Sequence, residues 1–82
     1  MKIITVAETP DYTVTSYGNG WAYRFANKTD HRDVWMQDDD ASLFREEWTE
    51  YENRWSDKPQ NDILGELWYI YECVSRPMEI EP

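Results

Sequence analysis

The residues of this sequence that could do chemistry are few, and the densest group is a run of three aspartates, Asp38, Asp39 and Asp40. Carboxylates are the ligands that Ca²⁺ and Mg²⁺ prefer in proteins. The rest of a calcium-binding loop is missing, because no glycine stands at the sixth position of the run and Thr49 stands at the twelfth. We therefore expect no metal here. We interpret the run as a helix start, where an aspartate caps free N–H groups and further acids suit the helix dipole.

The other reactive side chains are isolated from one another. His31 is the only histidine and lies in an expected turn, and Cys73 is the only cysteine and has no histidine near it in the sequence. The serines lack a nucleophile elbow or a suitably spaced base, and Gly18-Asn19-Gly20 does not match a phosphate-binding loop. The sequence therefore predicts a protein that is not an enzyme and that carries no cofactor.

Charge is distributed unevenly along the chain. Acids and bases cancel in residues 1–37, so the part from residue 38 onward carries the whole formal net charge of −9. A single-sign field of this density exceeds what solubility requires and predicts a basic protein as the partner. Phosphates would be repelled by it, so we expect no direct contact with nucleic acid.

Features that would export the chain or insert it in a membrane are absent from the sequence. No apolar stretch approaches the roughly 20 residues of a membrane span, and the apolar run near residue 3 is too short for a signal peptide. A single cysteine cannot form an internal disulfide. We expect a soluble cytoplasmic protein without a membrane partner.

The elements that must position these side chains begin with alternating apolar and polar residues, the pattern of β-strands. Two such runs flank Gly18-Asn19-Gly20 and predict a β-hairpin, because both central residues of its tight turn need a positive φ. A turn at residues 27–30 leads to a further strand at residues 32–37. Residues 3–7 offer a fourth strand.

The alternation also assigns side chains to the two faces of this sheet. We expect Trp21, Tyr23 and Phe25 to lie on the covered face and Arg24 on the open face. Trp35 alternates away from its apolar neighbours, so we expect it on the open face near Arg24.

From residue 38 onward the apolar residues repeat with the period of a helix. The first helix, of about four turns, would lay one aromatic stripe on the sheet, formed by Phe44, Trp48, Tyr51 and Trp55. After a break at Pro59, a second helix would pack through Ile63, Leu67, Ile70, Tyr71 and Val74. We expect Gly65 to let the second helix pack closely on the first.

Acidic side chains away from the aromatic stripe form the main candidate for partner binding. Glu46 and Glu50 lie on the far side of the first helix and Glu47 lies on its flank, with Asp38–Asp40 extending the field at its N-terminus. The density of these charges along the helix is of the order found in duplex DNA. The alternative interpretation is an ordinary solvated face in which Glu50 pairs with Arg54 four residues later.

Aromatic residues outside the packed stripes are the second candidate. We expect Trp35 on the open sheet face and Tyr69 opposite the packed stripe of the second helix, with Trp68 on its edge. Trp and Tyr are enriched at binding hot spots. A cation–π pair between Arg24 and Trp35 would explain Trp35 equally well.

Together these elements predict an α+β fold, in which a three- or four-stranded antiparallel sheet is packed on one face by a C-terminal two-helix hairpin. We expect residues 1–82 to form a single domain. Within it, residues 1–37 would form the sheet, residues 38–76 the helical hairpin and residues 77–82 a frayed tail.

In its size, acidity, lack of a catalytic motif and sheet-plus-helices build, the chain resembles small anti-defence proteins of phages and mobile elements, among them anti-CRISPR proteins. The resemblance lies in the compact domain and in Asp38–Asp40, Glu46, Glu47 and Glu50. It implies an inhibitor that binds a CRISPR effector complex in a bacterial host and blocks its target DNA. Because the first half is charge-neutral, the contact could instead be a steric plug using Trp35 or Tyr17.

Two other functions fit the same sequence. An antitoxin-like or regulatory partner of one basic protein would share the charge but would need no nucleic-acid groove. A structural protein would self-associate through exposed aromatic side chains, although repulsion between acidic copies opposes this and favours a monomer.

Overall fold

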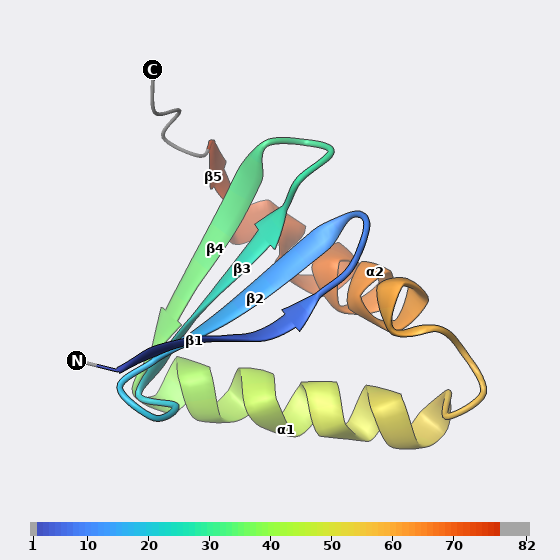
Figure 1. Ribbon diagram of the computed structural model, residues 1–82, viewed down its shortest axis with the longest axis horizontal. Helices are drawn as coiled ribbons and strands as arrows, with labels where there is room; N and C mark the ends of the chain where they lie inside the picture. Colours follow the sequence, from blue (N-terminus) through green and yellow to red (C-terminus); the bar gives the residue numbers. More distant parts are fainter. Residues whose placement is uncertain (1, 78–82) are drawn as a thin grey trace.

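The computed structural model describes residues 2–77 of the chain, which form one antiparallel sheet and two α-helices (Figure 1). The elements in chain order are β1 (Ile3–Glu8), β2 (Tyr12–Tyr17), β3 (Ala22–Asn27), β4 (Arg32–Gln37), α1 (Asp39–Arg54), α2 (Gln60–Tyr71), the short 3-10 helix η1 (Glu72–Val74) and β5 (Arg76–Pro77). The predicted α+β class is confirmed.

Within the described residues the sheet has five strands in the order β1-β2-β3-β4-β5, all antiparallel, which is more than the three or four expected. The fourth strand expected at residues 3–7 is present as β1, which carries a bulge between Thr5 and Ala7. The fifth strand consists of Arg76 and Pro77, which we had assigned to the helical hairpin and to the tail. The rest of the expected tail lies outside the described residues.

The turn between β2 and β3 has the expected backbone conformation, but the Trp21 side chain after it is not on the covered face. Asn19 and Gly20 both have positive φ, 58° and 96°, as this turn requires. The strand ladder begins only at Tyr17 and Ala22, so Trp21 lies beyond its end. Trp21 is consequently exposed, and its expected place on the covered face was wrong.

The core lies between the sheet and the two helices. Tyr23 and Phe25 are buried, as the alternation predicted. The ring centroid of Phe25 lies 5.4 Å from that of Phe44 on α1 and 5.3 Å from that of Trp68 on α2, so one strand residue joins both helices. Burying a side chain of this size contributes about 1.5–3 kcal/mol.

On α1 only the N-terminal half of the aromatic stripe reaches the centre of this core. Phe44 is fully buried, whereas Trp48 and Tyr51 are half-buried at its margin. Trp55 is the C-cap residue and packs on Tyr51, with ring centroids 5.1 Å apart. Figure 1 shows the reason: α1 extends beyond the sheet, so its last turn has no strand to cover.

The packed face of α2 is rotated from the expected one. Its buried residues are Ile63, Leu64, Leu67 and Trp68. Trp68, expected on the edge, is therefore a core residue, while Ile70 and Val74, expected in the core, are exposed. This happens because α2 packs over β2, where a Cβ at Gly65 would lie 3.5 Å from the Tyr12 hydroxyl. Gly65 thus faces the sheet and not α1, contrary to our expectation.

Candidate protein-binding surface

The acidic side chains of α1 divide into two rows. At about 100° per residue, Asp39, Glu46 and Glu50 share the face opposite the buried Phe44, and all three are exposed. We call these three residues the outer row. Asp40 and Glu47 lie on the flank that faces α2 and line a cleft there. The predicted acidic residues therefore do not form one patch.

Two of the three cations in residues 38–60 contact neutral groups. Arg45 donates to the Gly20 carbonyl oxygen at 3.4 Å and to the Tyr23 hydroxyl at 3.3 Å. The Lys58 ammonium lies 4.9 Å from the centre of the Trp55 ring.

The exception is Arg54, which donates to Glu50 at 2.6 Å and also lies 5.5 Å from the centre of the Tyr51 ring. This ion pair was predicted by the alternative interpretation, in which the acids form an ordinary solvated helix face. It is the only ion pair found between residues 38 and 77, a segment that contains eleven acids. Ten of those acids are exposed, so most of the negative charge faces solvent without a counter-ion.

Asp38 occupies the N-cap position of α1, as expected, but its side chain makes no capping hydrogen bond. Its Oδ1 instead accepts a hydrogen bond from Trp21 Nε1 at 3.0 Å, and its backbone N–H donates to the Trp21 carbonyl oxygen. This arrangement holds Asp38 at φ 55° and ψ −122°, an unfavourable conformation for a residue with a Cβ. The Asp38 side chain therefore connects α1 to the β2–β3 turn through Trp21 and does not cap the helix.

Trp35 lies on the open sheet face, as predicted, in a cluster with Tyr17 and Trp21 that we call the aromatic cluster. The Trp35 ring centre is 4.9 Å from that of Tyr17 and 6.4 Å from that of Trp21. Trp35 is 48% exposed and Trp21 43%. Because Asp38 bonds Trp21, the aromatic cluster adjoins the N-terminus of α1, where the outer row begins.

Tyr69 is 82% exposed on α2, as its place in the sequence predicted. It lines a shallow hollow with Arg32, Glu72 and Cys73. The structure therefore places it on a different surface from the acids of α1.

Glu47 is the one predicted acid that is half-buried. It accepts a hydrogen bond from the Tyr71 hydroxyl across the α1–α2 interface. Burial, together with the negative charge of Glu47, raises the pKa of Tyr71 far above its usual value. The phenol therefore stays protonated and serves as a fixed donor.

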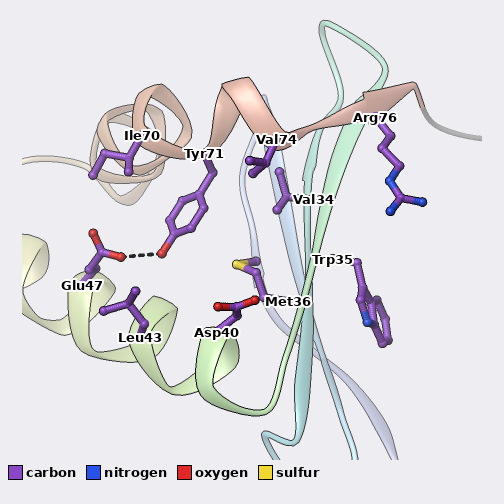
Figure 2. A pocket seen from close by; sticks show the side chains of 10 residues that line it. All are labelled: Val34, Trp35, Met36, Asp40, Leu43, Glu47, Ile70, Tyr71, Val74 and Arg76. Atoms are coloured by element: carbon purple, nitrogen blue, oxygen red, sulfur yellow. Dashed lines mark hydrogen bonds between the residues drawn. The ribbon is translucent and has the colours of Figure 1, made fainter.

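The cleft beside Glu47 has a volume of about 590 Å³ and lies between α1, the end of α2 and β4. Figure 2 shows that Leu43, Ile70 and Val74 approach it from three elements. No group of three or more potential metal ligands occurs in residues 2–77. Among those residues, no helix is long and apolar enough to cross a membrane.

No protein-family model matches this chain, and neither a curated protein nor a solved structure is significantly similar to it. The function must therefore be argued from the surface itself.

Sequence reasoning missed two features of this surface. Trp21 belongs to the aromatic cluster, and the signal was its position directly after the turn glycine, where a four-residue connection takes it out of the ladder. The cleft was missed because Ile70 and Val74 match a helical core stripe.

Proposed function

We propose that this protein is a small, acidic, non-enzymatic inhibitor that binds a basic protein and blocks its nucleic-acid-binding surface, in the manner of anti-CRISPR proteins. Its site of action would be the bacterial cytoplasm. The observation that carries the proposal is the exposed charge of α1. All acids of α1 except Glu47 are exposed and only Glu50 among them is ion-paired, while Arg45 and Lys58 contact a carbonyl group, a phenol and an aromatic ring.

The spacing of the outer row supports this proposal. Glu46 and Glu50 are about 6 Å apart along the helix axis, and Asp39 and Glu46 about 10 Å apart. One DNA strand carries a phosphate every 3.4 Å or so. The outer row thus matches every second or third phosphate, which is enough for a groove of lysine and arginine side chains to bind it.

The aromatic cluster complements the charge. Steering by opposite charges raises the association rate, whereas slow dissociation needs well-packed contacts. Trp21 and Trp35 expose large apolar surface while both indole N–H groups are already bonded, to Asp38 and Gln37 respectively. Burying these rings against a partner therefore leaves no indole donor unpaired.

The antitoxin-like alternative would use the same surface on a basic protein that binds no nucleic acid. The self-association alternative is favoured by a different observation. The edge strand β1 exposes Ile3, Ile4 and Val6, and an exposed apolar edge can pair with a second copy.

A pull-down from bacterial lysate at about 50 mM and about 500 mM salt tests the proposal, because counter-charged contacts weaken as ions screen them. We expect a basic nucleic-acid-binding protein to be captured at low salt, and its DNA to be displaced by the added chain. Capture of a target that keeps its DNA would favour the antitoxin-like function. Capture that does not change with salt would contradict the role of charge.

A further inference from the structure

The outer edge of β4 is only partly covered. β5 pairs with Arg32 and Asp33, and no other strand in the described part of the chain pairs with β4 on that side. The edge from Val34 to Gln37 is therefore open. Figure 2 shows that the cleft lies directly against this part of β4.

The backbone groups on this open edge can be assigned from the alternation of an antiparallel ladder. The Asp38 N–H donates to the Trp21 carbonyl oxygen on the β3 side. Successive residues bond to opposite neighbours, so the N–H and C=O groups of Gln37 and Trp35 point away from β3. They face the open edge, where an added strand would bond them.

The cleft offers a suitable site for one side chain of such a strand. Val34 and Met36 form its back wall, and the exposed Leu43 and Ile70 form its apolar sides (Figure 2). These groups would pack on the aliphatic stem of a long side chain.

The negative charge of the cleft favours a side chain that ends in a cationic group. Asp40 and Glu47 both line the cleft. Arg76 also lines the cleft, but its guanidinium group lies on the Trp35 side of β4, away from the two carboxylates (Figure 2). The two carboxylates are therefore left to meet an incoming cation.

We propose that the open edge of β4 binds an extended segment of a partner protein as an added strand, with one lysine or arginine side chain of that segment entering the cleft toward Asp40 and Glu47. Side chains of a strand alternate between its two faces. The neighbours of the cation would therefore lie on the open sheet face beside Trp35. This is strand addition with a side-chain pocket for specificity.

A second copy of this chain fits the site less well. Pairing two β4 edges would bring together two acidic α1 helices, and the segment from Val34 to Gln37 contains no cation. A basic partner is therefore the better occupant. This inference does not require the partner to bind nucleic acid, so it stands apart from the proposed function.

The test uses two synthetic peptides and the full chain. The probe is the acetylated amide Arg-Val-Arg-Val-Arg-Val, and the control peptide has proline in place of each valine, which keeps the charge but prevents strand pairing. Binding is followed by NMR titration and by amide hydrogen exchange. We expect the valine peptide to slow exchange at Trp35 and Gln37 at least tenfold, and the proline peptide to leave both unchanged.

Protein variants then test the cleft. The double variant D40N/E47Q removes both charges but keeps a carbonyl oxygen that can accept the bond from Tyr71. The matched control E52Q/D57N removes two exposed charges that lie outside both the cleft and the outer row. We expect D40N/E47Q to weaken peptide binding about tenfold and the control to change it less than about threefold.

Three results would overturn the inference. Equal binding of the two peptides would show a contact by charge alone, and equal loss in the two double variants would show that the cleft has no special part. Protection of Trp35 and Gln37 without any peptide, in a sample that sediments as a dimer, would show that a second copy occupies the edge.

Discussion

The two halves of the chain differ in how many of their acids are paired with a cation. In residues 2–37, Arg24 pairs with Asp33 at 2.7 Å and Lys28 with Glu8 at 2.8 Å, so two of the four acids there are ion-paired. In residues 38–77 only one of the eleven acids is ion-paired, Glu50 to Arg54, while Arg45 and Lys58 contact a carbonyl group, a phenol and a ring. Most acids of the described helical half therefore face solvent without a cation in direct contact. Charge balance on a surface depends on which acceptor each cation reaches, as well as on numbers.

The two halves nevertheless share one core, and truncating it gives the largest expected effect. Phe44 from the helical half is fully buried against Tyr23 and Phe25 of the sheet, with ring centres 5.5 and 5.4 Å away. Phe44→Ala should lower the free energy of unfolding by about 3–5 kcal/mol, as measured by urea denaturation. Trp48→Ala should cost less than Phe44→Ala, because Trp48 is only half-buried. A larger loss of stability for Trp48→Ala than for Phe44→Ala would mean that the centre of the core lies nearer Trp48 than Phe44.

The aromatic cluster should separate binding from stability. Trp35→Ala removes an exposed ring, so it should lower the free energy of unfolding by only about 1 kcal/mol. The same change should weaken partner binding at least tenfold if Trp35 is a hot spot. Tyr69→Ala is the control, because this equally aromatic side chain lies on another surface. Equal binding by both variants would remove the aromatic cluster from the interface.

Low pH should lower the stability that the hydrogen bonds to the Asp11 carboxylate provide between the sheet and α2. Asn61 at the start of α2 and Thr29 in the sheet half donate to the carboxylate of Asp11, and these hydrogen bonds lower its pKa below the ordinary 3.8. A lowered pKa gives stability that is present above the ordinary value and is lost as pH falls through the folded-state value.

Urea denaturation at pH 5 and pH 3 measures this effect. Asp11→Asn should lose less stability between the two pH values than the unchanged chain. Asp57→Asn serves as the control, since the structure shows no hydrogen bond to this exposed side chain within residues 2–77. An Asp11→Asn variant as acid-sensitive as the unchanged chain would rule out a contribution from this carboxylate.

The smallest expected effect concerns the ion pair between Glu50 and Arg54. Glu50→Gln removes the charge that pairs with Arg54, and both side chains are more than half exposed. The cost should be about 0.3–0.5 kcal/mol and should diminish at high salt. A cost above about 1 kcal/mol would mean that Arg54 is held by this pair more than by the Tyr51 and Trp55 rings that it contacts.

The sequence predicted those parts of the fold that follow from local periodicity. The alternation in residues 12–17 and 32–37 fixed two strands, and the positive φ values of Asn19 and Gly20 followed from their residue types. β5 could not be predicted, because a strand of two residues has no periodicity. Its pairing depends on η1 delivering the chain to β4 and on the bonds from Arg32 to Ser75.

The candidate surface was predictable in composition but not in arrangement. Exposure of Glu46 and Glu50 followed from their positions opposite Phe44. The hydrogen bond between Trp21 and Asp38 joins residues 17 positions apart in the sequence. No local sequence pattern at either residue indicates this bond. The cleft depends on the rotation of α2, which turns Gly65 toward Tyr12 and leaves Ile70 exposed.

The central claim is that the charge of the outer row contacts a basic partner, and two matched charge reversals test it. Both E46K/E50K and D57K/E66K replace two exposed acids, so each brings the formal net charge from −9 to −5, but only the first changes the outer row. The measurement is target-DNA binding by a CRISPR effector complex in the presence of each variant. The account predicts that E46K/E50K loses inhibition, because like charges now meet across the interface. D57K/E66K should retain inhibition, and both variants should keep a nearly unchanged melting temperature. Full inhibition by folded E46K/E50K would contradict the account.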